Sequence, residues 1–264
     1  MQLIKFCNSE HNINSGASLR VGTLFQYRTI ENSELRDGEE GNFEFVINFP
    51  EEIELDRQTA NLLLAGAVHF GGDDDLQTPR FPGTMSANIE HLHLVRQHAN
   101  SVVVKDTSVR VKRTTINSLI FCMSAMKDAT NCPFEGYNDS WSVPIQKANS
   151  LANRIGELIL LQSKLDNFEK HLSKSHSPSS IKHLGINIRH QKVEYRDRTL
   201  NVTPKKPISY NNLVKLLSDI PFSKPTSFSA ECEYRFIFDL VDQERIYPPV
   251  VDYVDLNLNL LANI

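Results

Sequence analysis

Apolar and polar side chains alternate along much of the chain, which predicts strands. Residues 43–50 (FEFVINFP) alternate and then stop at a proline, as expected of an exposed strand. Residues 101–126 contain the apolar runs 102–104 and 120–123, which predict two or three strands with buried segments. The other segments with strand-like patterns are residues 19–23, 181–198, 228–240 and the tail after the Pro-Pro turn at 248–249.

Two segments have the spacing of amphipathic helices. In residues 147–172, apolar side chains recur every three or four positions. Residues 209–220 predict a shorter helix with Ser209 as its N-cap. Residues 51–100 show the least readable pattern and are expected to form an insertion. Since the chain has no internal repeat and no Gly/Ser linker, we expect a single mixed α+β domain over residues 1–264.

Composition excludes several classes of protein. The chain has 264 residues, 40% hydrophobic and 23% charged, which is typical of a soluble globular protein. Its net charge of -4 gives no overall attraction to nucleic acid, although residues 109–113 and 203–207 are local basic segments. The start resembles no signal peptide and no stretch approaches the length of a membrane span. A cytoplasmic protein with no membrane partner is therefore expected.

The cysteines and histidines do not predict a metal site. None of the four cysteines forms a C-x-x-C pair, and Cys122 and Cys232 fall in apolar runs, where a thiol behaves as a small hydrophobe. His91, His93 and His98 lie close together, but no acidic or cysteine ligand accompanies them at a telling spacing. No metal site is therefore assigned.

Two glutamates stand one residue apart in FSAECEYRFIFDL (228–240). Because side chains alternate across a strand, Glu231 and Glu233 are expected on one face, where their mutual repulsion raises one or both pKa values. They could be the solvated end of a strand, with Arg235 and Lys224 as partners. They could also be a catalytic pair for an oxocarbenium-like transition state, in which one carboxylate stabilises the charge and the other deprotonates an acceptor.

Two further residues fit the catalytic interpretation. Arg20 lies in a strand just before Gly22, where it could reach a phosphate or a ribose, although a surface arginine has the same pattern. Ser124 ends an apolar strand and could orient a glutamate, or it could simply begin a loop.

Together these pieces resemble the R-S-E pattern of the ADP-ribosyltransferase superfamily, here LRVGT, FCMS and ECE in the same order. The chain is also similar to bacterial and phage proteins with C-x-S, an aromatic loop (here GYNDSW, 136–141), Lys224, Phe228 and E-x-E-Y-R. The resemblance implies two packed, mainly antiparallel sheets flanked by helices. It further implies a mono-ADP-ribosyltransferase that uses NAD as its substrate.

The resemblance also implies roles for individual residues. Glu233 would be the catalytic glutamate, Ser124 would orient it and Glu231 would serve the acceptor. The positions implied to contact NAD are Arg20, Gly22, Thr23, Tyr27 and Tyr137, with the tyrosines stacking on nicotinamide. The acceptor is left open as a protein side chain, an RNA or DNA base, or a small molecule. Enzymes of this kind are often toxins or phage-defence effectors, sometimes held by an antitoxin protein.

A non-catalytic protein of the same fold is the alternative hypothesis. It would bind nucleic acid or a partner and would have no NAD pocket. Arg110 and Lys112, which alternate with Val109 and Val111 on one strand, could form a nucleic-acid-facing strip together with Lys205 and Lys206. The simpler interpretation of that strand is a half-buried one with a charged outer face. A two-metal nuclease would need additional acidic ligands.

Overall fold

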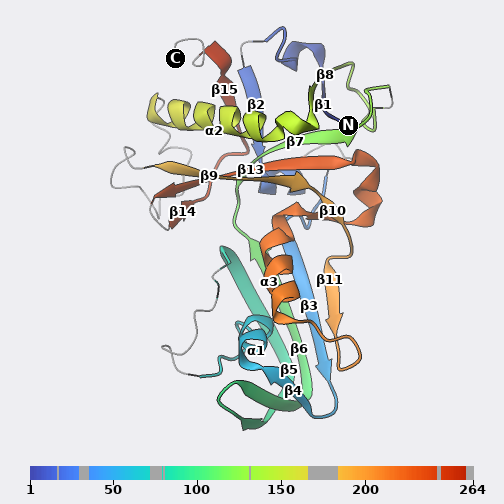
Figure 1. Cartoon of the computed structure of the whole chain (residues 1–264), viewed down its shortest axis with the longest axis vertical. Coiled ribbons are helices and arrows are strands. Elements are labelled where there is room, and N and C mark those ends of the chain that lie inside the picture. The colour runs from blue at the N-terminus through green and yellow to red at the C-terminus, as the bar shows by residue number, and fades with distance from the viewer. Residues whose placement is uncertain are drawn as a thin grey trace. The chain divides into compact units, whose positions relative to one another are not determined.

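The computed structural model describes residues 1–16, 18–29, 36–71, 79, 81–130, 132–165, 184–242 and 245–259 (Figure 1). It is a mixed α+β structure, mostly strands, with two main sheets, which confirms the α+β prediction. The chain divides into two compact units. The first comprises Met1–Glu40, Asn117–Tyr195 and Lys224–Ile264, and the second comprises Gly41–Ile116 and Arg196–Ser223. The single domain with an insertion at 51–100 stays a prediction.

The sheet of the first unit is antiparallel in all its described pairs. Its strands are β1 (Gln2–Cys7), β2 (Ser18–Thr23), β7 (Leu119–Met126), β8 (Asp139–Pro144), β9 (Gly185–Lys192), β13 (Glu233–Asp242), β14 (Arg245–Tyr247) and β15 (Tyr253–Asn257). β7 lies at the centre and pairs with β13 along one edge, with Glu233 opposite Ser124. β9 follows β13 on its other edge.

This sheet forks at the second edge of β7. β1 pairs with residues 124–126 of β7, whereas β2 pairs with residues 119 and 120. β8 continues the branch of β1, and β15 continues the branch of β2. Among the described pairs, residues 121–123 of β7 therefore lie between the branches, and a cleft can open there.

An apolar helix covers one face of the first sheet. Helix α2 (Ala148–Leu165) follows the short turn η3 (Ile145–Lys147) and lies across the strands in Figure 1. Ile155 and Ile159 of α2 belong to the same buried cluster as Phe121, Met123 and Phe236. Because side chains alternate along β7 and β13, their neighbours Cys122, Ser124, Glu233 and Arg235 lie on the opposite face.

The second unit contains the curled half-barrel. Its strands are β3 (Asn42–Phe49), β4 (Ile53–Asp56), β5 (Gly83–Gln97), β6 (Ser101–Thr115) and β11 (Thr199–Val202), with helices α1 (Arg57–Leu63) and α3 (Tyr210–Asp219). The pair β3–β11 is parallel and the other described pairs of this sheet are antiparallel. Leu213, Leu216 and Leu217 of α3 pack in a buried cluster with Phe45 and Ile47 of β3.

The pattern-based predictions for this unit hold in part. The Ser209 side chain accepts a hydrogen bond from the Asn212 amide, which confirms the N-cap of α3. Val109 and Val111 are buried while Arg110 and Lys112 are exposed, as the half-buried strand predicted. The prediction of an exposed strand at 43–50 was wrong, because β3 pairs with β6 and β11 on its two edges.

Short elements complete the described chain. They are β10 (Glu194–Tyr195), β12 (Ser223–Lys224), η1 (Ser9–His11), η2 (Leu24–Arg28), η7 (Ile220–Phe222) and η8 (Thr226–Glu231). The helix predicted over 147–172 is present as α2, and residues 166–172 lie outside the described residues. Within the part of the chain that the structure describes, no helix is long and apolar enough to cross a membrane.

Gly156 lets α2 pack closely on the sheet, which gives a test of the fold. A Cβ at this buried position would lie 2.6 Å from Ile188 Cδ1 of β9. We expect Gly156→Leu to lower the free energy of unfolding by about 1–3 kcal/mol through overpacking. The exposed neighbour Asn153 provides the control, because Asn153→Leu should change stability by less than about 0.5 kcal/mol. Urea denaturation measures both, and equal effects would contradict the close packing.

Candidate active site

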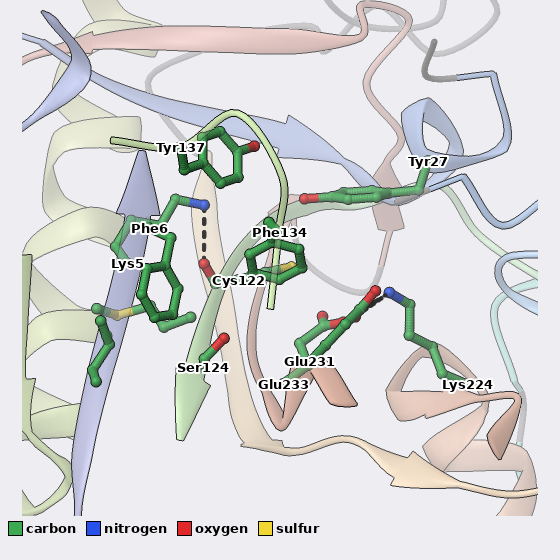
Figure 2. A pocket seen from close by; sticks show the side chains of 12 residues that line it. Lys5, Phe6, Tyr27, Cys122, Ser124, Phe134, Tyr137, Lys224, Glu231 and Glu233 are labelled. Atoms are coloured by element: carbon green, nitrogen blue, oxygen red, sulfur yellow. Dashed lines mark hydrogen bonds and ion pairs between the residues drawn. The ribbon is translucent and has the colours of Figure 1, made fainter. Parts of the chain in front are cut away.

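A small pocket opens on the face of the first sheet opposite α2 (Figure 2). Its cavity volume is about 50 Å³. It is lined by Ile4, Lys5, Phe6, Tyr27, Cys122, Met123, Ser124, Phe134, Tyr137, Lys224, Glu231 and Glu233. Three residues assigned to catalysis from the sequence, Ser124, Glu231 and Glu233, therefore line one cavity.

A larger cleft of about 410 Å³ adjoins this pocket at the fork of the sheet. It shares Lys5, Phe6, Tyr27, Cys122 and Tyr137 with the pocket, and residues from β1, β2 and β7 form most of its wall. Pocket and cleft therefore adjoin along these five shared residues. The fork therefore explains why a cavity forms beside β7.

Glu231 and Glu233 meet through a turn and not through strand alternation. Glu231 ends η8, Cys232 has left-handed φ and ψ angles of 47° and 41°, and β13 begins at Glu233. The prediction that both glutamates lie on one strand was therefore wrong. Both nevertheless reach Lys224, whose Nζ lies 2.7 Å from Glu231 Oε2 and 3.1 Å from Glu233 Oε2. The left-handed turn at a non-glycine residue costs about 1–2 kcal/mol.

The two glutamates belong to a buried chain of alternating charges. Arg235 Nε donates to Glu233 Oε1 at 2.6 Å, and Arg235 Nη1 donates to Glu40 Oε1 at 3.0 Å. Arg235 and Glu40 are 0% exposed, and Glu231 and Glu233 are at most 7% exposed. The interpretation as a solvated strand end was therefore wrong, although its proposed partners, Lys224 and Arg235, are the ones observed.

The surroundings push the pKa values of the two glutamates apart. Burial favours a neutral Glu233, but Arg235 and Lys224 overcome it and hold the pKa of Glu233 well below its usual range. Burial dominates at Glu231, with repulsion from Glu233 in addition, and raises its pKa to about 7. Glu231 Oε1 is buried and has no hydrogen-bond partner among the described residues. Near neutral pH, Glu233 is therefore ionised and Glu231 can exchange a proton.

Ser124 and Cys122 complete the wall beside Glu233. Ser124 is the direct antiparallel partner of Glu233, so both side chains lie on the pocket face. Burial and the Glu233 carboxylate raise the pKa of the Cys122 thiol to about 12, and the thiol also hydrogen-bonds Glu233. Cys122 is thus a neutral donor at the site, and the hydrophobic role predicted for it was incomplete. Cys232, which was also expected to be buried, is exposed.

The residues predicted to contact NAD are divided between the two cavities. Tyr27 and Tyr137 line both, whereas Arg20 and Gly22 line only the cleft. A Cβ on Gly22 would lie 2.6 Å from Oε1 of the Gln26 side chain, so this side chain packs against the glycine. Thr23 is buried and its side chain accepts a hydrogen bond from the Gln26 amide, so it caps η2 and lines neither cavity.

Arg20 is engaged by another strand. Its Nε and Nη2 donate to the two carboxylate oxygens of Asp255 at 2.8 and 3.0 Å, and its guanidinium lies 3.9 Å from the centre of the Tyr253 ring. The structure thus places Arg20 in the cleft and away from the lining of the pocket that holds the glutamates. A phosphate-binding role for it stays a prediction.

Two residues of this site could not be found from sequence patterns. Glu40 lies in an acidic, glycine-containing segment that resembles a solvated loop, yet it is fully buried against Arg235. Lys5 lies in a strand whose side chains are apolar on both faces. No family model, curated protein or solved structure matches this chain. Among the described residues, no group of three or more His, Cys, Asp or Glu could hold a metal ion.

The charge chain predicts a strong effect of Arg235 on stability. Arg235→Met leaves Glu233 and Glu40 buried without their shared cation, so we expect the free energy of unfolding to fall by about 3–5 kcal/mol. Adding Glu40→Gln should recover part of that loss. The exposed Arg245 of β14 is the matched control, and Arg245→Met should be nearly neutral. Similar losses for both arginines in urea denaturation would argue against the charge chain.

The raised pKa of Glu231 predicts a pH dependence of stability. The folded protein holds the Glu231 proton up to about pH 7, whereas the unfolded chain releases it near 4.5. This contribution is complete below pH 4.5 and is lost as the pH rises through about 7. We expect the free energy of unfolding of the wild type, relative to that of Glu231→Gln, to fall by about 1–3 kcal/mol between pH 5 and pH 8. Urea denaturation of both proteins at each pH measures this difference. A constant difference would contradict a raised pKa.

Proposed function

We propose that this protein is an NAD-dependent ADP-ribosyltransferase that moves ADP-ribose to a protein or nucleic-acid acceptor. The observation that carries the proposal is the pair of buried carboxylates in the pocket that adjoins the cleft, with pKa values displaced in opposite directions. Such separated pKa values are typical of carboxylates with different chemical roles.

The two carboxylates match the two requirements of the reaction. The bond between the nicotinamide nitrogen and the ribose carbon breaks, nicotinamide leaves as a neutral molecule, and positive charge develops on the sugar. Ionised Glu233 stabilises that charge and accepts a hydrogen bond from a ribose hydroxyl, through the lone pairs that Arg235 and Lys224 leave. Glu231 takes the proton of the acceptor as its oxygen, nitrogen or sulfur bonds to the ribose carbon.

The shape of the cavity supports an elongated donor. The cleft volume of about 410 Å³ lies within the range of small-molecule sites, roughly 300–1,000 Å³. The nicotinamide ribose lies in the pocket beside Glu233, where Tyr27, Phe134 and Tyr137 offer aromatic faces (Figure 2). The rest of the donor follows the fork toward β2. Ser124, opposite Glu233, keeps the carboxylate oriented.

The proposal includes the finer fold and the biological setting implied by the sequence. The branches β1–β8 and β2–β15 that diverge from β7 support an ADP-ribosyltransferase-like arrangement of packed sheets. A cytoplasmic toxin or phage-defence effector, held by an antitoxin protein, fits a reaction that inactivates its acceptor.

Incubation of the protein with adenine-labelled NAD and a cell lysate tests this function. Wild type should release nicotinamide and label an acceptor. RNase, DNase and protease digestion of the label then identify the acceptor class. Glu231→Gln resembles the protonated acid and should stay folded, while acceptor labelling falls about 10²- to 10⁴-fold because the general base is lost. Glu157→Gln, an exposed position on α2, should leave labelling unchanged.

Glu233 needs a second variant, because its charge balances Arg235 and Lys224. Glu233→Gln should abolish nicotinamide release, and Glu233→Asp, which keeps the charge, should retain stability better than Glu233→Gln. Thermal unfolding of each variant separates loss of catalysis from loss of fold. A folded wild type that releases no nicotinamide and labels nothing would favour the non-catalytic binding protein instead.

A further inference from the structure

Lys5 occupies the junction between the pocket and the cleft. It lies on β1 in the branch that diverges from β2, and it lines both cavities. Its Nζ donates to the carbonyl oxygen of Cys122 at 3.0 Å, as the dashed line in Figure 2 shows. Cys122 belongs to the segment of β7 between the two branches, so the fork itself sets the position of this amine.

The ammonium group of Lys5 lacks a carboxylate partner in the described part of the chain. An ammonium has three donors, and among the described residues the hydrogen-bond acceptor of Lys5 Nζ is the neutral carbonyl oxygen of Cys122. The ring of Phe121 adds a cation–π contact at 4.9 Å. Burial lowers the pKa of Lys5, which reflects the cost of burying its charge, and attraction to nearby groups such as the Glu233 carboxylate offsets that cost only in part. A ligand anion would remove that cost.

The other cations around the two cavities are already neutralised. Lys224 contacts Glu231 and Glu233, and Arg20 is held by both oxygens of Asp255. Lys5 alone among these three has a neutral acceptor and open space on both sides. An anionic group that enters the fork therefore meets Lys5 as its available cation.

We infer that Lys5 binds a phosphate group of a nucleotide that lies along the cleft, where the half-buried aromatic side chains of Tyr27 and Tyr137 can contact the rings of the nucleotide. Under the proposed function, on which this identification of the ligand rests, the group is the diphosphate of NAD. Lys5 then takes the role that the sequence pattern assigned to Arg20. The junction position places the diphosphate between the ribose at Glu233 and the remainder of the donor in the cleft.

Binding of NAD, ADP-ribose, ADP and adenosine to the full chain, by isothermal titration calorimetry, tests the inference. Lys5→Met should weaken the three phosphate-bearing ligands by about 10- to 100-fold, the value of a charge-assisted hydrogen bond, and leave adenosine unchanged. Lys5→Arg should retain part of the affinity, and Lys147→Met, at an exposed position, should have no effect. Thermal unfolding confirms that each variant is folded.

The outcomes separate this inference from the proposed function. If ADP binds in a Lys5-dependent way but NAD is never cleaved, the phosphate site stands and the transferase fails. If wild type and Lys5→Met cleave NAD with the same KM, the transferase stands and the phosphate site fails. Equal losses for ADP and adenosine, or a wild type that binds none of the phosphate-bearing ligands, would also overturn the phosphate site.

Discussion

The burial of Arg235 is the constraint on which the site depends. A guanidinium cannot lose its proton, so a fully buried one requires anions at hydrogen-bonding distance. Glu233 supplies one from the same strand, and Glu40 supplies another from 195 residues away in sequence. Lys224 then joins Glu233 to Glu231. Three carboxylates thus share two cations. Burial raises the pKa of Glu40 and of Glu231, whereas Glu233, which contacts both cations, has a lowered pKa.

The two glutamates of this cluster differ in how firmly their neighbours hold them. Glu233 contacts both cations, whereas among the described residues Glu231 forms an ion pair only with Lys224, and its Oε1 has no hydrogen-bond partner there. The fork of the first sheet brings open space to the same point, because β1 and β2 leave the middle of β7 uncovered. The charged cluster therefore lies beside the cavity because of how the strands of the first sheet pair.

Local patterns predicted the elements better than the contacts between them. The strands β3, β7 and β13, the helices α2 and α3, and the cap at Ser209 all follow from periodicity and capping chemistry. β1 was missed because Leu3, Ile4, Phe6 and Cys7 are all buried, which leaves no alternation to detect. The unusual E-x-E pair indicated a site, but its burial could not be predicted.

Sequence patterns could not predict which charged residues pair with each other when they are far apart in the chain. Glu40 looks like a loop residue until Arg235 is placed beside it, and a lysine in a short apolar strand does not reveal that it faces a cavity. The pairing of Arg20 with Asp255 likewise depends on the register of β2 with β15. Such information appears only once distant strands have been aligned.

The left-handed residue between the two glutamates has a consequence for how the motif should be searched for. Cys232 is exposed, so its side chain is free to vary, but its backbone must adopt a positive φ. Glycine, asparagine and aspartate meet that requirement with little strain, and valine or isoleucine do not. The residue between the two glutamates of E-x-E is therefore restricted by its backbone conformation. Chains with a β-branched residue at that position should hold their two glutamates in a different arrangement.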